Sequence, residues 1–226
     1  MPIAIDATST QTGGEAAFTT LSWSHTTSGD DRILYVEVAF GPTTAETVSS
    51  ITYNSVALTE VISENGGDNN RISIWRLIAP ATGANTVLVT MSASTLRGCA
   101  AAISLTGVDQ TTPDDTASAG TATDTTPTIN ITNSATDDLV LGFLNFRNET
   151  AATVGAGQTT RVTQTGNPTS QNLYCSSEPG AAGTITISWS GASNLWKIAA
   201  FSVNPVAVVA NPVYQPWYHR APVLAQ

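Results

Sequence analysis

The stretch Thr86-Val87-Leu88-Val89-Thr90-Met91-Ser92 carries the pattern from which the fold of this chain is predicted. Its β-branched residues favour a pleated strand over a helix, because branching at Cβ restricts the side chain in a helix. Similar short apolar stretches recur at intervals of roughly ten residues, separated by clusters of Gly, Asn, Asp, Ser and Pro. This spacing is typical of an all-β sandwich or barrel, and almost nothing in the chain predicts a helix.

The predicted strands share this composition and spacing. They are Phe18–Ser24, Arg32–Phe40, Val48–Tyr53, Ala57–Ser63, Arg71–Ile78, Thr86–Ser92, Gly98–Thr106, Thr128–Thr132, Leu139–Arg147, Thr159–Gln164, Asn172–Ser177, Thr184–Ser190 and Leu195–Val203. The dipeptide Asn54-Ser55 predicts a tight hairpin between two of them. We expect the inward faces to carry Phe40, Trp75, Ile103, Leu105, Phe146, Trp189 and Phe201.

A repeat divides the chain into two halves. Residues 184–190, Thr-Ile-Thr-Ile-Ser-Trp-Ser, match residues 86–92 at an offset of about 98, and Ala101–Leu105 matches Ala199–Val203 at the same offset. The halves are predicted to span residues about 17–109 and 127–203 and to share a strand order. Two arrangements fit: one sandwich over residues 1–203 whose two sheets are formed by both halves together, which we favour, or two tandem small β-sandwiches.

Composition and charge exclude two classes of partner. The 226 residues include 17 acidic and 8 basic ones, which gives a formal net charge of −9. Phosphate contacts require clustered Lys and Arg, so we expect no nucleic-acid partner, and anionic membranes are disfavoured for the same reason. Met1–Ile5 lacks the basic and apolar regions of a secretory signal peptide, and no apolar run is long enough to span a bilayer.

Residues 204–226 differ from the rest of the chain. They contain four prolines and no acidic residue, so they predict an extended arm instead of a helix or an inner strand. An arm this apolar is expected to be covered, either by its own sandwich or by a neighbouring subunit. We favour the neighbour, because aromatic anchors carry much of the energy of such contacts. The predicted partner-binding residues are Val213, Tyr214, Trp217, Tyr218 and Leu224.

Catalytic chemistry has little support in the sequence. The chain has two histidines, His25 and His219, both expected at the surface, and no G-x-S-x-G motif. Glu37 lies within a strand, but nothing marks a partner for it. We therefore expect no catalytic residue, no metal ligand, no cofactor and no enzymatic activity. The remaining acidic pairs are interpreted as turn residues: Asp30-Asp31, Asp114-Asp115 and Asp137-Asp138.

The two cysteines, Cys99 and Cys175, lack the C-x-x-C spacing of a metal or redox motif. We expect buried thiols, and a disulfide stays open because both residues lie on the apolar phase of predicted strands. The segment Glu64–Asn70 is only loosely similar to a calcium loop, and a hairpin loop explains it better.

Three stretches carry a resemblance to a known group: residues 48–59, residues 74–77 and residues 103–113. With them the chain, over residues of about 30–205, resembles a diffuse group of β-sandwich proteins of tailed-phage virions and of bacterial surface or secreted proteins. The resemblance implies a jelly-roll-like antiparallel sandwich used for display, cementing or adhesion. It carries no functional residue across, and the arm from Asn204 onward lies outside it.

The expected function is that of a non-enzymatic virion structural protein. A capsid decoration or cement protein is the favoured form, assembled in the host cytoplasm, with the major capsid protein and copies of itself as partners; a tail or fibre protein is a variant. The alternative is a carbohydrate-binding module or adhesin at the cell surface, which predicts solvent-facing tryptophans beside a bound glycan. A glycoside hydrolase would need two opposed carboxylates in a cleft, and nothing in the sequence predicts them.

Overall fold

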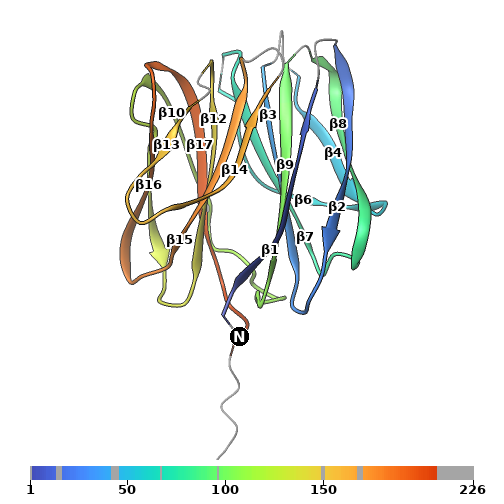
Figure 1. Ribbon diagram of the computed structural model, residues 1–226, viewed down its shortest axis with the longest axis vertical. Coiled ribbons are helices and arrows are strands. Elements are labelled where there is room, and N and C mark those ends of the chain that lie inside the picture. Colours follow the sequence, from blue (N-terminus) through green and yellow to red (C-terminus); the bar gives the residue numbers. More distant parts are fainter. Residues whose placement is uncertain are drawn as a thin grey trace, which may run out of the picture.

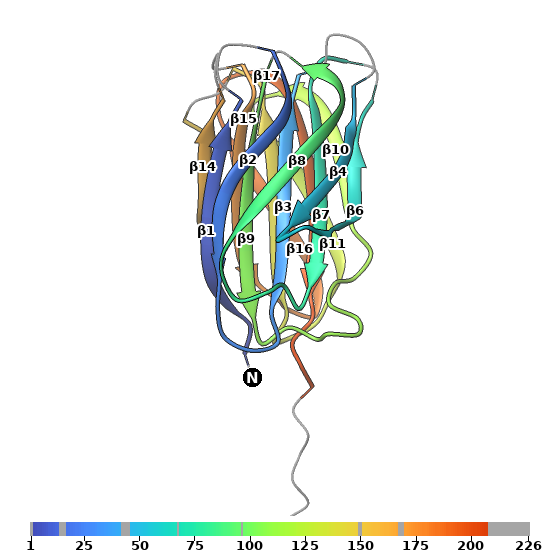
Figure 2. The same ribbon diagram turned by 90° about the vertical axis from the view of Figure 1, so that its right-hand side faces the viewer.

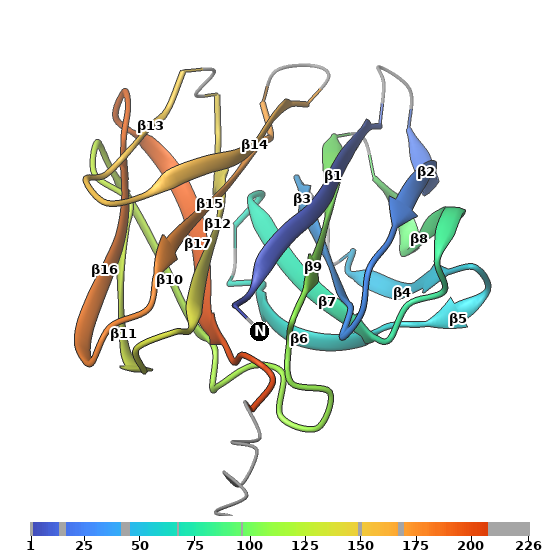
Figure 3. The ribbon, with the colours of Figure 1, turned by 60° about the horizontal axis from the view of Figure 1, so that its bottom comes forward.

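The computed structural model describes residues 2–13, 17–41, 46–66, 68–95, 97–148, 151–166 and 170–207. All regular secondary structure among these residues is β-strand, arranged in four antiparallel sheets that lie side by side as stacked layers (Figure 1). The predicted class, an all-β antiparallel sandwich, is confirmed. The Val203 end of the last strand and the start of β1 lie at the same end of the stack, which we call the base (Figure 3).

The first half of the chain forms two of the four sheets. Its inner sheet has the order β1(Ala4–Thr12), β9(Gly98–Thr106), β3(Ile33–Phe40), β7(Arg71–Ile78), β6(Thr59–Glu64). Its outer sheet, seen face-on in Figure 2, has the order β2(Phe18–Thr27), β8(Gly83–Thr95), β4(Val48–Tyr53), β5(Val56–Ala57).

The second half forms the other two sheets in a corresponding order. Its inner sheet is β10(Ser118–Asp124), β17(Asn194–Val203), β12(Leu139–Phe146), β15(Asn172–Pro179), β14(Thr159–Thr165). Its outer sheet is β11(Thr128–Ser134), β16(Gly183–Ser190), β13(Thr153–Val154). In both halves the chain crosses repeatedly between the two sheets, and the last strand returns between the first and the third, which gives a jelly-roll-like connectivity. The exceptions are the consecutive pairs β4–β5, β6–β7 and β14–β15, each of which stays within one sheet.

The arrangement of the halves corrects the favoured prediction. No sheet among the described residues mixes strands of the two halves, so the chain forms two tandem sandwiches, the alternative that the sequence left open. The physical reason is that each half closes an apolar core between its own two sheets. One core surrounds Phe40 and Tyr53, and the other surrounds Phe146 and Trp189.

A third apolar cluster joins the two sandwiches. It is formed by the facing inner sheets and contains Tyr35 and Ile103 from the first half and Phe143 and Phe201 from the second. The inner strands are therefore covered on both faces, and every residue of β3 is buried. A strand buried on both faces must be apolar almost without interruption, whereas the outer strand β2 alternates between exposed and buried positions.

Most of the predicted inward-facing residues are buried. Phe40, Ile103, Leu105, Phe146, Trp189 and Phe201 are all at most 2% exposed, while Trp75 is only half-buried. The predicted hairpin is also confirmed. Thr52 pairs with Ala57 and Tyr53 pairs with Val56, and both turn residues have positive φ, as a two-residue hairpin of this type requires.

Candidate functional site

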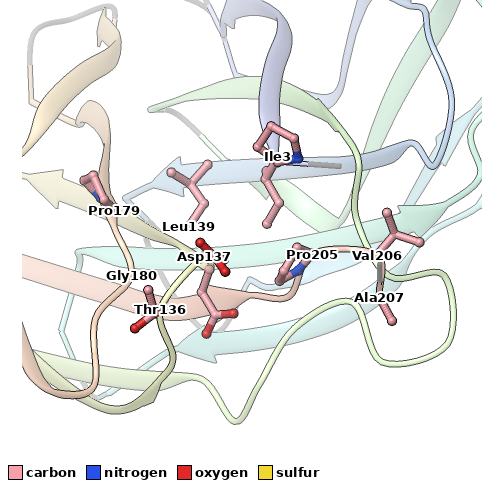
Figure 4. A pocket seen from close by; sticks show the side chains of 11 residues that line it. Ile3, Thr136, Asp137, Leu139, Pro179, Gly180, Pro205, Val206 and Ala207 are labelled. Atoms are coloured by element: carbon pink, nitrogen blue, oxygen red, sulfur yellow. The ribbon is translucent and has the colours of Figure 1, made fainter. Parts of the chain in front are cut away.

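A hollow of about 860 Å³ opens at the base (Figure 4). Both ends of the described chain come together there (Figure 3). We call it the base hollow. Its walls come from three segments of the second half and from the N-terminus. They are Pro2, Ile3, Thr136, Asp137, Asp138, Leu139, Pro179, Gly180, Pro205, Val206 and Ala207.

One wall is the turn between β11 and β12. The carboxylate of Asp138 accepts a hydrogen bond from the Ala135 amide at 2.6 Å and another from the Ser202 hydroxyl at 2.8 Å. The Asp138 carbonyl accepts a hydrogen bond from the Gly180 amide at 2.8 Å, which ties the second wall to the first. Asp137 has a φ of 80°, a backbone conformation that aspartate adopts more readily than most residues. The predicted turn role of this acidic pair is confirmed.

The opposite wall is the start of the C-terminal segment. The Asn204 amide donates to the Pro113 carbonyl and the Val206 amide donates to the Gly107 carbonyl, each at 2.9 Å. Pro205 also forms an isolated bridge with Val108. The backbone beyond β17 is therefore held against the crossover between the halves as far as Val206, and Ala207 stands at the lip of the hollow.

The lining of the base hollow is largely apolar. Ile3, Leu139 and Val206 are half-buried and present aliphatic carbon to the space, as Figure 4 shows. Asp137 is exposed and carries the free carboxylate of the rim, whereas Asp138 is buried in its hydrogen bonds. No histidine or cysteine lines the hollow among the described residues. The arrangement can bind an apolar chain with a positive group at its edge, and it offers no acid–base pair or nucleophile.

The five arm residues that the sequence assigns to partner binding cannot be placed in the base hollow or elsewhere on the fold. Val213, Tyr214, Trp217, Tyr218 and Leu224 lie outside the described residues, which end at Ala207. The described part of the predicted arm is residues 204–207, and residues 205–207 form one wall of the base hollow.

A second polar cluster surrounds His25, and here the prediction was wrong. His25 was expected at the surface, but it lies on β2 in phase with Leu21 and Trp23 and is 1% exposed. Extending the alternation of the predicted strand Phe18–Ser24 by one residue would have placed it inward. Burial lowers the pKa of His25 to about 4, against the weaker opposite effect of the Asp6 carboxylate.

The hydrogen bonds of this cluster run across three strands. His25 Nδ1 lies 2.8 Å from Ser9 Oγ, and His25 Nε2 lies 3.1 Å from Ser104 Oγ. Ser104 in turn donates to Asp6 at 2.7 Å, and Trp23 Nε1 donates to Ser9 at 2.9 Å. Because the Ser104 hydroxyl stands between the carboxylate and the imidazole, Asp6 does not orient His25 directly as it would in a Ser-His-Asp triad. The cluster links β1, β2 and β9 and satisfies their buried polar groups.

A third cluster lies at the seam between the halves. Arg76 forms an ion pair with Asp114, whose other oxygen accepts a hydrogen bond from the Tyr35 hydroxyl at 3.0 Å. The hollow beside it measures about 380 Å³ and also exposes Glu60 and Asp115. Burial, with the Asp114 charge, raises the pKa of Tyr35 well above its ordinary value. Both oxygens of Asp114 are already engaged, so this cluster fixes the crossover segment to β3 and β7.

Glu37 is buried between the two sandwiches. It is 1% exposed, and neither carboxylate oxygen has a hydrogen bond of normal geometry to any described residue. Burial raises its pKa well above the ordinary value, against a smaller opposite effect of the Leu144 backbone. The nearby thiols of Cys99 and Cys175 are both free and buried, so the open question of a disulfide is answered: they do not pair. Burial raises the pKa of both thiols.

The described residues lack three kinds of feature. They contain no cluster of three or more His, Cys, Asp or Glu side chains suited to a metal ion. The same part of the chain has no helix that could cross a membrane. Trp23, Trp189 and Trp196 are buried and Trp75 is half-buried, with its indole nitrogen bonded to Ser73. None of these four indoles therefore forms the exposed platform that a glycan-binding sandwich would present.

Comparison of the chain with models of protein families, with curated proteins and with solved structures yields no match. The functional conclusion therefore rests on the geometry of the base hollow and on the sequence of the segment that leaves it.

Proposed function

We propose that this chain is a non-enzymatic structural protein of a virion, in the form of a capsid decoration or cement protein. The two sandwiches act as one rigid body that lies over a seam of the shell, and the C-terminal segment attaches it to its neighbours. Its partners are the major capsid protein and further copies of itself.

One observation carries this proposal: the C-terminal segment leaves the body at a fixed point beside an apolar hollow. Hydrogen bonds hold residues 204–206 to the crossover, and Val206 and Ala207 line the base hollow. Segment 208–226 then supplies Val213, Tyr214, Trp217 and other apolar side chains without an acidic residue. A mobile anchor point would lose entropy on every attachment, whereas a fixed one leaves only the segment to be ordered.

The layered body also suits a mechanical role. Three apolar clusters run through the stack from one outer sheet to the other, so a load on either outer sheet is transmitted through packed side chains. The outward residues of the outer strands β2 and β16 are mostly Thr and Ser, which leaves these faces uncharged although the chain carries a net charge of −9. An uncharged face can approach a neighbouring subunit without charge repulsion.

The test is addition of the full chain to expanded shells of the major capsid protein from the same genome. We expect it to bind and to raise the temperature at which the shells rupture, because attachment at several subunits adds buried apolar area, worth about 25 cal/mol per Å² before association costs. The variant Trp217→Ala/Tyr218→Ala should bind more weakly, and the control Asn65→Ala, in an exposed loop after β6 and outside the outer sheets, should behave as the parent. Failure of the parent chain to bind, or an unchanged rupture temperature at saturation, would contradict the proposal.

A further inference from the structure

We propose that the base hollow receives part of segment 208–226 from a second copy of this chain, so that two copies meet base to base and exchange their C-terminal segments. The inference rests on the proposed function in one respect, that segment 208–226 is an attachment segment. The inference adds the binding site of that segment, which is the base hollow of the second copy.

The hollow and the segment match in size and character. A volume of about 860 Å³ is in the range of sites that enclose a ligand of several rings. Ile3, Leu139 and Pro179 offer aliphatic walls, and the segment offers Trp217 and Tyr218. Aromatic side chains that enter a closed apolar pocket are the usual anchors of a stable interface. The hollow accommodates a few such side chains, and the rest of the segment would lie along the base.

Charge favours the same pairing. The segment contains Arg220 and His219 and no acidic residue, whereas residues 1–207 hold all 17 acidic residues of the chain. The rim of the hollow presents the exposed carboxylate of Asp137. Two such acidic bodies repel each other, and a basic group of one placed on the acidic rim of the other offsets part of that repulsion.

The length of the segment decides between its own hollow and that of a neighbour. Ala207 already lines its own hollow, so that site lies within the first few residues of the segment. Pro212, Pro216 and Pro222 favour an extended chain, which advances about 3.1 Å per residue. Tyr214 to Tyr218 would then lie roughly 20–35 Å from Ala207, beyond the hollow of the same copy and within reach of a hollow facing it.

Exchange between two copies also closes the assembly. A two-fold axis through the base would place each segment opposite the hollow of the partner, so both contacts form at once and no binding surface is left open. In this arrangement the hollow of each copy is filled by the segment of the other.

The experiment traps the contact between distinct full-length chains. Thr136→Cys, on the exposed rim of the hollow, is made in a chain with an affinity tag, and Ala221→Cys, between Tyr218 and Leu224, is made in an untagged chain. The two are mixed, oxidised mildly with oxidised glutathione and separated without reductant. Ser94→Cys replaces Thr136→Cys in the control, because Ser94 is exposed near the far end of β8. The native thiols are buried and do not compete.

We expect the mixed dimer of Thr136→Cys with Ala221→Cys to exceed that of the control pair at least tenfold. A yield no higher than the control overturns the inference. A disulfide that forms only within single chains of the double variant Thr136→Cys/Ala221→Cys also overturns it, because the segment then fills its own hollow.

A second measurement needs no cysteine. Sedimentation equilibrium of the unmodified chain should show a dimer, and Asp137→Asn should weaken it several-fold. The control Glu60→Gln, at an exposed position on β6 and outside the base hollow, should leave the dimer unchanged. A monomeric parent chain overturns the inference. The two proposals fail separately. If the chain raises the shell rupture temperature but forms no mixed dimer, the proposed function stands and this inference is wrong. If a mixed dimer forms but the chain does not bind shells, this inference stands and the proposed function is wrong.

Discussion

Tyr35 and Phe201 meet across the boundary between the two sandwiches, with ring centroids 5.0 Å apart and ring planes tilted by 49°. Tyr35 lies on β3 of the first half and Phe201 on β17 of the second. Phe201 also stacks on Phe143 at 5.5 Å. The Tyr35 hydroxyl reaches Asp114 in the crossover. One aromatic group thus connects the inner sheets of both halves with the segment that joins them.

Phe201→Ala should lower the free energy of unfolding by about 3–5 kcal/mol, because it leaves a cavity in a fully packed cluster. Urea unfolding followed by tryptophan fluorescence measures this loss. Since the cluster couples the sandwiches, we expect one transition in the parent chain and a broader or split one in Phe201→Ala. Phe146→Ala, in the core of the second sandwich alone, is the matched control and should lose stability without the same splitting. A loss below about 1 kcal/mol would show that the boundary is not tightly packed.

Glu37→Gln should stabilise the protein at neutral pH. Because the pKa of Glu37 is raised in the folded chain, Glu37 lowers the free energy of unfolding only where the unfolded carboxyl is ionised. This loss is absent below the unfolded pKa near 4.5 and grows as the pH rises above it. The variant should therefore match the parent near pH 4 and exceed it by about 1–3 kcal/mol at pH 7. Thermal unfolding over this pH range measures the difference, with the exposed Asp30→Asn as control. An unchanged difference across the range would mean that Glu37 is solvated or paired.

His25 should make the protein sensitive to acid. Its pKa is about 4 in the folded chain and about 6.5 when unfolded, so the unfolded state takes up the proton first as the pH falls. The contribution of neutral His25 to the free energy of unfolding is fully present above pH 6.5. It is lost as the pH falls from about 6.5 to 4, a loss on the order of 3 kcal/mol. The slope of stability against pH in this window should flatten in His25→Gln. An equal slope in both chains would contradict burial of a neutral His25.

Removing the Lys197 ammonium group should cost less stability than removing the two carboxylates that face it. The ammonium group is 1% exposed and lies 3.0 Å from Asp68 and 3.4 Å from Glu64, which are partly exposed. Lys197→Met leaves two carboxylates that water can still reach, so we expect a loss of about 1 kcal/mol or less. Glu64→Gln/Asp68→Asn leaves a buried cation without its counter-charges and should lose about 3–5 kcal/mol. Denaturant unfolding decides the order, and the reverse order would contradict this description of the site.

The sequence failed to predict β1 and β10 for a common reason. Both are edge strands that pair on one side only, β1 with β9 and β10 with β17. Unlike β2, which is also an edge strand, neither β1 nor β10 has a fully buried residue. Backbone hydrogen bonds to one neighbour hold them, so their side chains need not form an apolar row. The segments Ala4–Thr12 and Ser118–Asp124 are accordingly rich in Thr, Ser and Ala and lack the alternation that marks β2 or β8.

The candidate site was only half visible in the sequence. The prolines and aromatic residues of segment 204–226 predicted an attachment arm, but the base hollow could not be predicted. Its walls come from Ile3, Leu139, Pro179 and Val206, which lie far apart in the chain and share no motif. The burial of Glu37 could not be predicted for a related reason, since the sheet that covers its side chain belongs to the other half.

The amino-acid sequence by itself determined the all-β class, the strands with apolar rows, the Asn54-Ser55 hairpin and the change of character after Val203, because each depends on neighbouring residues along the chain. Only the tertiary structure decided that each half closes its own sandwich and that the inner sheets then pack on each other. That choice depends on which apolar faces cover which. The faces of β3 and β12 are apolar on both sides, and local sequence does not say whether the second cover comes from the same half or from the other.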